Sequence, residues 1–278
     1  MTFQLEDFAE DVLAKAMAGK GIGPKGLAEE AGLDREVVDR ALEGEFGDPD
    51  SLRAMARALD LAADPLLEIA QQAWSPEPHE VAGLRRFSTN FEEIMDVNSY
   101  LVWDPATRHA AAFDAGTDAG PMLTFLDREG LTLDAIFLTH THADHVVALE
   151  KLARESGMPP VFTPHQEPFD GAEPFEQGRK FDVGGLTIES RLTSGHSVGG
   201  TTYVVEGLAR TVAIVGDALF AGSMGGPKIS YADALRTNRL HIFSLPGSTV
   251  LCPGHGPLTT VDEEKAHNPF FAHAHAHA

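Results

Sequence analysis

The chain has little of what stabilises secreted or membrane proteins. Among its 278 residues there is one cysteine, Cys252, so an internal disulfide is excluded and a reducing compartment is indicated. No apolar run approaches twenty residues, which excludes a membrane-spanning helix. Acidic Glu6, Asp7, Glu10 and Asp11 stand where a signal peptide would be basic. We therefore expect a cytoplasmic protein without a membrane partner.

Basic side chains are also scarce. There are 21 Lys and Arg against 42 Asp and Glu, which gives a formal net charge of −21. Contacts to a polyanion need clustered Lys and Arg, so this charge argues against nucleic acid as a partner. A small-molecule substrate is the expected partner.

The overall composition is that of a globular protein, with 43% hydrophobic and 23% charged residues. The chain is long enough for two modest domains. We predict a helical domain over residues 1–74, a proline-containing linker over 75–84 and a second domain over 85–271. The His/Ala-rich tail, 272–278, is interpreted as a disordered end or a purification tag outside any site.

Residues 1–74 have apolar side chains at helical spacing, interrupted by glycine turns, and Asp50 is a candidate N-cap. The stretch from Lys25 to Leu33, followed by Asp34–Glu43, resembles the phage-repressor type of helix-turn-helix domain. That resemblance implies a fold that commonly reads DNA.

The charge of this segment argues against DNA as its target. Residues 1–75 contain seven basic and sixteen acidic side chains. The helix that would enter the groove, Asp34–Glu43, carries four carboxylates and only Arg35 and Arg40 as cations. We favour a protein-contact or homodimer-forming module over a DNA-binding one.

The most informative stretch is Thr139–His145. It follows the apolar run 135–138 and contains four metal-ligand side chains: His140, His142, Asp144 and His145. At the end of a strand, two histidines spaced by two can point the same way, and the later pair can turn toward a second position. Such a group without a cation would leave buried imidazoles and a carboxylate uncompensated. The pattern predicts two metal ions.

This stretch resembles the HxHxDH signature of the metallo-β-lactamase superfamily, and three later segments resemble its remaining motifs in the same order. They are Gly195-His196, Gly216-Asp217 and Gly254-His255, each just after an apolar or β-branched stretch. The resemblance implies an α/β fold, a four-layer αββα sandwich, here preceded by the small helical domain.

The resemblance also implies roles for individual residues. His140, His142 and His196 would hold the first metal, Asp144, His145 and His255 the second, and Asp217 would bridge the two. Asp144 and Asp217 are the expected catalytic carboxylates. Asp114 would support the metal loop, with a plain turn aspartate as the alternative. Cys252 is interpreted as core packing rather than as a ligand.

Histidine and carboxylate ligands are compatible with zinc, which we expect, and also with iron or manganese. Two such ions would ionise a shared water near neutral pH, and that hydroxide would attack a carbonyl. Segments 216–226, 245–260 and 263–271 resemble the short bacterial form of glyoxalase II, which implies hydrolysis of a hydroxyacyl thioester such as S-lactoylglutathione.

Substrate contacts are predicted around the loop that follows Asp217. That group has Arg or Lys where this chain has Gly226, and Lys228 is the nearest cation. Lys228 would bind a substrate carboxylate, helped by Tyr231 or Arg236, and a solvated lysine is the alternative. His165 is either a pocket residue or a surface histidine.

Two other functions remain open. Persulfide dioxygenases resemble the chain in the same motifs but use a single iron, so one metal with oxygen uptake would indicate that activity. The metal domain could instead sense a metabolite for the helical domain, and binding to duplex DNA would support such a regulator.

Overall fold

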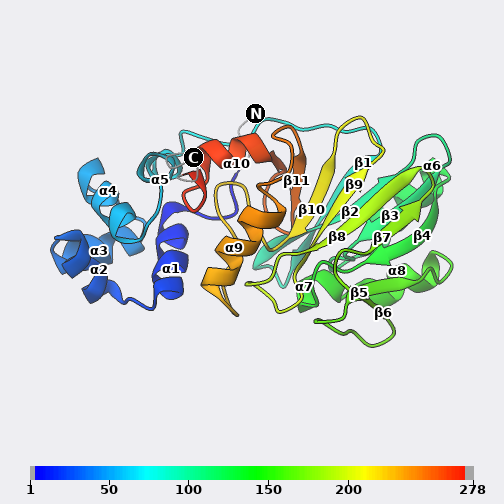
Figure 1. Ribbon diagram of the computed structural model, residues 1–278, viewed down its shortest axis with the longest axis horizontal. Helices are drawn as coiled ribbons and strands as arrows, with labels where there is room; N and C mark the ends of the chain where they lie inside the picture. Colours follow the sequence, from blue (N-terminus) through cyan, green and yellow to red (C-terminus); the bar gives the residue numbers. More distant parts are fainter. Residues whose placement is uncertain (1–3, 273–278) are drawn as a thin grey trace.

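The computed structural model describes residues 4–272, so the predicted His/Ala tail lies outside the described part except for Ala272. Two six-stranded sheets face each other, and helices cover their outer surfaces (Figure 1). The five N-terminal helices lie at one end of this sandwich. No helix of the described residues is long and apolar enough to cross a membrane.

The first sheet has the strand order β1-β2-β3-β4-β5-β6. The first three strands pair antiparallel, and β3 to β6 pair parallel. Its strands are β1 (Leu84–Phe91), β2 (Met95–Trp103), β3 (His109–Phe113), β4 (Thr132–Phe137), β5 (Val161–Pro164) and β6 (Glu173–Phe175).

The second sheet has the order β12-β11-β10-β9-β8-β7. All its pairs are antiparallel except β10 with β11. Its strands are β7 (Lys180–Val183), β8 (Leu186–Leu192), β9 (Thr201–Glu206), β10 (Val212–Gly216), β11 (Val250–Pro253) and β12 (Thr259–Thr260).

Alternation along the strands separates the layers, because successive side chains point to opposite faces of a sheet. In β3, Ala111 and Phe113 belong to the core between the two sheets, together with Tyr203 of β9. Ala110 and Ala112 belong instead to the core under the outer helices of the first sheet. Cys252 is fully buried between the sheets.

Helices complete the four layers. On the first sheet, α6 (Gly120–Glu129) and α8 (Leu149–Glu155) supply apolar side chains to the outer core, and the one-turn helix α7 (Ala143–Val146) carries part of the metal motif. On the second sheet the outer helices are α9 (Tyr231–His241) and α10 (Val261–His267). The predicted αββα sandwich is confirmed.

The N-terminal region is all helical, as predicted. Its helices are α1 (Ala9–Lys20), α2 (Pro24–Ala31), α3 (Arg35–Leu42), α4 (Pro49–Ala58) and α5 (Ala63–Ala70). The predicted cap of α4 was wrong by two residues. Asp48, not Asp50, is the N-cap, and its side chain accepts hydrogen bonds from the backbone N–H groups of Asp50 and Ser51. Proline 49 fits the first helical position, which places the cap before it.

The N-terminal helices share one apolar core with the outer layer of the second sheet. Leu13 of α1 and Leu66 of α5 belong to the same buried cluster as Val215, Ile242 and Phe271. Further contacts lie outside this core: Trp74 stacks on His267 at 4.8 Å, and the Glu68 carboxylate is 2.7 Å from His267 Nδ1.

In the predicted linker, residues 75–83 contain neither helix nor strand, and β1 begins at its last residue, Leu84. They are nevertheless held against α10. The N–H of Glu77 donates to Glu263, and His79 Nε2 lies 2.7 Å from a Glu263 oxygen. The helical region therefore has a defined position on the sandwich.

Candidate metal centre

Four loops at one edge of the two sheets bring the predicted metal ligands together. They follow β4, β8, β10 and β11, and the strands β4, β10 and β11 each have a parallel neighbour. The carboxyl ends of neighbouring parallel strands meet at the same edge, so residues far apart in sequence converge there. Seven side chains form two groups: His140, His142, His196 and Asp217, and then Asp144, His145 and His255.

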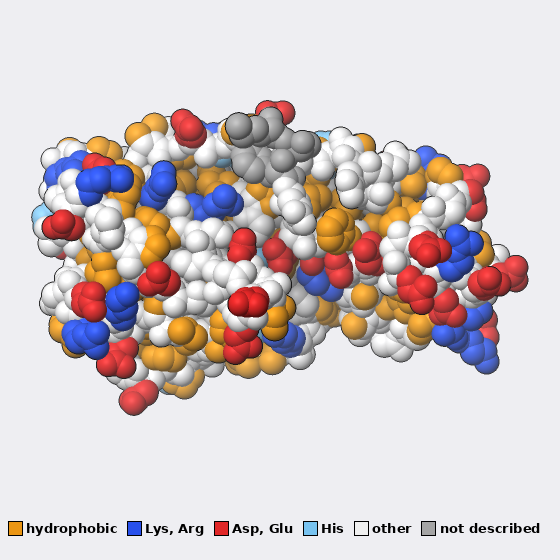
Figure 2. Space-filling model, turned by 180° about the vertical axis from the view of Figure 1, so that it is seen from behind, with side chains coloured by type: hydrophobic (Ala, Val, Ile, Leu, Met, Phe, Trp, Pro, Cys, Tyr) orange, Lys and Arg blue, Asp and Glu red, His pale blue; other side chains and the backbone are white. Residues whose placement is uncertain are grey.

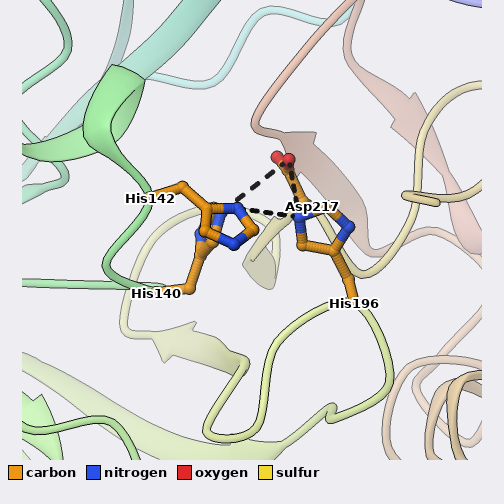
Figure 3. A group of neighbouring side chains, drawn as sticks. All are labelled: His140, His142, His196 and Asp217. Atoms are coloured by element: carbon orange, nitrogen blue, oxygen red, sulfur yellow. Dashed lines mark hydrogen bonds and ion pairs between the residues drawn. The ribbon is translucent and has the colours of Figure 1, made fainter. Parts of the chain in front are cut away.

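The first group is three histidines arranged around Asp217 (Figure 3). Asp217 Oδ2 lies 3.4 Å from His196 Nε2 and 3.8 Å from His140 Nε2. His142 presents Nδ1, which is 3.0 Å from His196 Nε2. The ligand atoms of each group lie within 4.8 Å of one another, which is the convergence that a single ion requires.

The second group adjoins the first through the same aspartate. Nε2 of His145 and Nε2 of His255 each lie 3.3 Å from Asp144 Oδ2. Asp217 Oδ1 is 3.4 Å from His145 Nε2, and its Oδ2 is 3.5 Å from His255 Nε2. Asp217 Oδ2 therefore lies near ligand atoms of both groups, and Oδ1 lies near His145 of the second group.

Partners at Nδ1 orient three of the imidazoles. His145 donates to Asp114, His196 to the carbonyl of Gly226, and His255 to the carbonyl of Asp96, over 2.7 to 2.9 Å. In a neutral imidazole, a hydrogen bond donated by Nδ1 leaves Nε2 without a proton and able to bind a metal.

The ligand atoms have the properties of an incomplete site that a cation would fit. His140 Nε2, His145 Nε2 and Asp217 Oδ1 are buried without a hydrogen-bond partner among the described residues. Buried polar atoms without partners cost free energy. Divalent cations prefer these imidazole and carboxylate donors, so a pair of metal ions would satisfy all three atoms at once.

The electrostatics of the two groups differ. Burial holds the pKa of His140 well below its usual value and also lowers that of His196, which favours the neutral, metal-binding form. Burial alone would lower the pKa of His145, but Asp114 and Asp217 outweigh it and raise that pKa to about 10. Negative charge therefore dominates around His145, which favours a cation there.

Comparison with known proteins agrees with this ligand set. The family model of the metallo-beta-lactamase superfamily matches residues 94–255, which is more than half of the chain. The chain belongs to this superfamily. The match spans all seven ligand positions, and the chain is a metallo-hydrolase of the metallo-beta-lactamase superfamily with two His/Asp clusters.

Curated relatives within the superfamily are distant. A probable metallo-hydrolase of Streptococcus pyogenes is 30% identical over 199 residues, covering 62% of this chain and 84% of the relative. The hydroxyacylglutathione hydrolase GloC of Haemophilus influenzae is 26% identical over 197 residues, covering 62% and 92%.

Solved structures of the superfamily are similar as well. The BLEG-1 B3 metallo-beta-lactamase is 27% identical with a TM-score of 0.58, and the match covers 67% of this chain and 98% of that one. TTHA1623, solved in a di-iron-bound form, is 27% identical with a TM-score of 0.53, covering 66% and 100%. About a third of this chain is thus outside each match.

Glycine is required beside the ligands of this superfamily member. A Cβ at Gly254 would lie 2.1 Å from Asp217 Oδ1 and 2.8 Å from His145 Cε1. Gly254 has no left-handed backbone, so lack of space alone excludes a side chain. The glycine before His255 lets the backbone approach the bridging carboxylate.

A cavity of about 470 Å³ opens over the ligands of both groups. Its apolar wall contains Phe91, Met95 and Phe220, and Lys228 supplies a cation. The N-terminal region also contributes to its lining, through Glu6, Asp7 and Lys15.

Of the predicted substrate-contact residues, one lines the metal cavity and the others do not. Lys228 lines the cavity and is exposed. Tyr231 packs on Gly19 of α1, where a Cβ would meet its ring at 2.3 Å. The cap of α9 explains this, because Ser230 accepts a hydrogen bond from the N–H of Asp233 and starts the helix at Tyr231. Tyr231 is not among the residues that line the metal cavity.

Arg236 and His165 are also absent from the cavity lining. Arg236 is exposed on α9 and pairs with Asp233 at 2.7 Å. His165 is exposed directly after β5. Sequence reasoning missed Glu6, Asp7 and Lys15, because no local pattern signals that the first helix reaches the metal loops.

Proposed function

We propose that this superfamily member hydrolyses a hydroxyacyl thioester in a reaction that depends on two divalent metal ions, most simply zinc. The observation that carries the proposal is the position of Asp217, whose carboxylate lies within 3.5 Å of ligand atoms of both groups. Two groups that share a carboxylate suit a dinuclear hydrolytic site. The similarity to hydroxyacylglutathione hydrolases supports the thioester.

When bound, the two ions would supply an ionised water and a Lewis acid for the carbonyl oxygen. The residues of the chain would do the rest. His145, His196 and His255 are fixed by their Nδ1 hydrogen bonds, so little reorganisation is needed during reaction. The apolar side chains Phe91 and Phe220 would hold the acyl part and limit access of bulk water.

A thioester suits this set of residues because a thiolate leaves without protonation. Of the carboxylates that line the cavity, Asp144 and Asp217 lie among the metal ligands and Asp7 pairs with Lys15, which leaves Glu6, and a thiolate does not require protonation by it. Lys228 would bind a carboxylate of the substrate at the cavity mouth.

The iron dioxygenase is the alternative that the metal content distinguishes. A single-iron enzyme needs one group of ligands, whereas this chain has a complete second group in Asp144, His145 and His255. Because persulfide dioxygenases resemble the chain in the same motifs, the number of metal ions bound, rather than the presence of these side chains, separates the two activities.

The decisive experiment combines metal analysis with a panel of thioesters, using protein without residues 272–278. We expect two metal ions per chain and thioester hydrolysis. Asp217→Ala should lose both together, whereas Asp34→Ala, which changes an exposed acidic residue outside the site, should lose neither. One iron with oxygen uptake, or full activity in Asp217→Ala, would overturn the proposal.

The role of Lys228 has its own test. Lys228→Ala should raise KM for a thioester carrying a carboxylate by about tenfold while kcat changes little, because an ion pair to a non-reacting group is lost. Lys25→Ala is the matched control, since Lys25 is an exposed lysine of α2. An unchanged KM in Lys228→Ala would remove this contact.

A further inference from the structure

The segment before α1 reaches the metal centre. A Cβ on Gly256, the residue after the ligand His255, would lie 3.1 Å from Glu6 Cβ. Glu6 lines the metal cavity and also a neighbouring groove of about 550 Å³. Met95 is likewise common to both, so the groove continues the cavity on the side of His255.

Several contacts hold this segment in place. The Lys15 ammonium pairs with Asp7, donates to the carbonyl of Met224 over 2.9 Å and lies 5.0 Å from the centroid of the Phe220 ring. Met224 and Phe220 belong to the loop that follows the ligand Asp217. The first helix is thereby attached to the metal loop, and Glu6 has a fixed position beside the centre.

Glu6 differs from its neighbour Asp7 in lacking a partner. Among the described residues Glu6 has neither an ion pair nor a hydrogen bond, although it is half-buried. Burial raises the pKa of its carboxyl, which expresses the cost of desolvating the charge. A carboxylate in this position is compensated when a cation binds beside it.

The groove beyond Glu6 is suited to a polar group. Its lining includes Arg86, Ser88, Asn90 and Asn98, and Gln4 closes it from the N-terminal side. About two thirds of this chain suffices to match 98% and 100% of two solved relatives. Gln4, Leu5 and Glu6 precede α1 and lie outside the αββα sandwich, so the N-terminal region adds this wall to a groove whose other walls belong to the sandwich.

We propose that Glu6 is a specificity-determining residue that binds an ammonium group in the thiol half of the substrate. The inference rests on the proposed dinuclear hydrolase, in which the thiol half of the substrate would lie on the side of the second group of ligands, next to Gly256. The substrate class is then a thioester of an amino thiol, with its ammonium group in the groove.

Binding of two thiols to the metal-loaded protein tests this without any turnover. Thiolates bind such metals, and 3-aminopropane-1-thiol differs from butane-1-thiol in having an ammonium in place of a methyl group. Calorimetry gives the affinity of each variant for the two thiols, and their ratio is the preference for the amino thiol. Any effect of thiol acidity cancels when the preferences of two variants are compared.

We expect Glu6→Gln to reduce this preference about fivefold, as for loss of a partly exposed ion pair. Glu36→Gln is the matched control, because Glu36 is an exposed glutamate of α3 and its replacement changes the net charge equally. Its preference should equal that of the unmodified protein. Glu6→Lys should bind 3-mercaptopropionate, a thiol that carries a carboxylate, more tightly than 3-aminopropane-1-thiol.

An equal preference in the unmodified protein and in Glu6→Gln would overturn the inference. So would a uniform change in the affinity for both thiols, because Glu6 would then act only on the charge of the metal centre. The thiol result is independent of thioester hydrolysis, so failure of the thioester panel and failure of this inference are separate outcomes.

Discussion

Asp114 accepts a hydrogen bond from His145, with 2.9 Å between Oδ2 and Nδ1. The same carboxylate accepts hydrogen bonds from the N–H and the hydroxyl of Thr139. Asp114 thus connects the end of β3 to both ends of the metal motif, and it does so from a left-handed backbone conformation with φ of 58°.

Asp114→Asn should weaken metal binding about 10- to 100-fold, because the amide is a poorer acceptor for His145 and its NH₂ group opposes the Thr139 donors. Competition with a chelator measures this. Asp134→Asn is the matched control, since Asp134 pairs with His109 at 2.7 Å on the surface. Equal metal affinity in the two variants would contradict a supporting role for Asp114.

Gly254→Ala should reduce metal content and activity together, at least about tenfold, because its Cβ would overlap Asp217 Oδ1. Metal analysis and the thioester assay measure the loss. Gly47→Ala should retain both, since a Cβ at Gly47 meets nothing within 4 Å. Full metal content in Gly254→Ala would show that the loop can move aside.

Glu264 predicts a pH-dependent stability. It is fully buried, and burial raises its pKa to about 8 although Thr259, Asn268 and the N–H of Gly222 donate to it. Between its unfolded and folded pKa values the folded state binds the extra proton. The free energy of unfolding should therefore fall by about 1.4 kcal/mol per pH unit from about pH 5 to pH 8 through this group.

Denaturation at pH 5, 7 and 9 measures this slope. Glu264→Gln should flatten it, because the amide does not titrate. Glu150→Gln, which changes a side chain that is 91% exposed, should keep it. An unchanged slope in Glu264→Gln would assign the pH dependence to other groups.

We expect no binding to duplex DNA at any salt concentration. Arg35 and Arg40, the two cations of α3, already pair with Asp39 at 2.7 Å and Glu45 at 3.0 Å. Figure 2 shows acidic and basic side chains interspersed over the end of the molecule formed by the N-terminal helices. A salt titration followed by fluorescence anisotropy tests this, and tight binding at low salt would restore the regulator hypothesis.

The sequence predicted the parts of the molecule that depend on local pattern. His140 to His145 directly follow a buried strand, so their convergence follows from strand geometry, and the αββα layers follow from the alternation in strands such as β3. The cap of α4 was misplaced by two residues, because Asp48 and Asp50 both carry a capping side chain.

Contacts between distant segments could not be predicted in this way. Lys15 donates to Met224, 209 residues away, and nothing in either segment signals the other. The same holds for Tyr231, which spacing alone placed near the substrate. Its ring packs on Gly19 of the first helix, and no pattern in either segment signals this contact.

The N-terminal helices and the layer of α9 and α10 have a single apolar interior between them. Removal of the first 74 residues would expose the apolar side chains of α9 and α10 to water. The remaining fragment would then aggregate rather than fold as a smaller enzyme. Use of the αββα sandwich without its N-terminal helices would first require charged substitutions on the exposed face of α9 and α10.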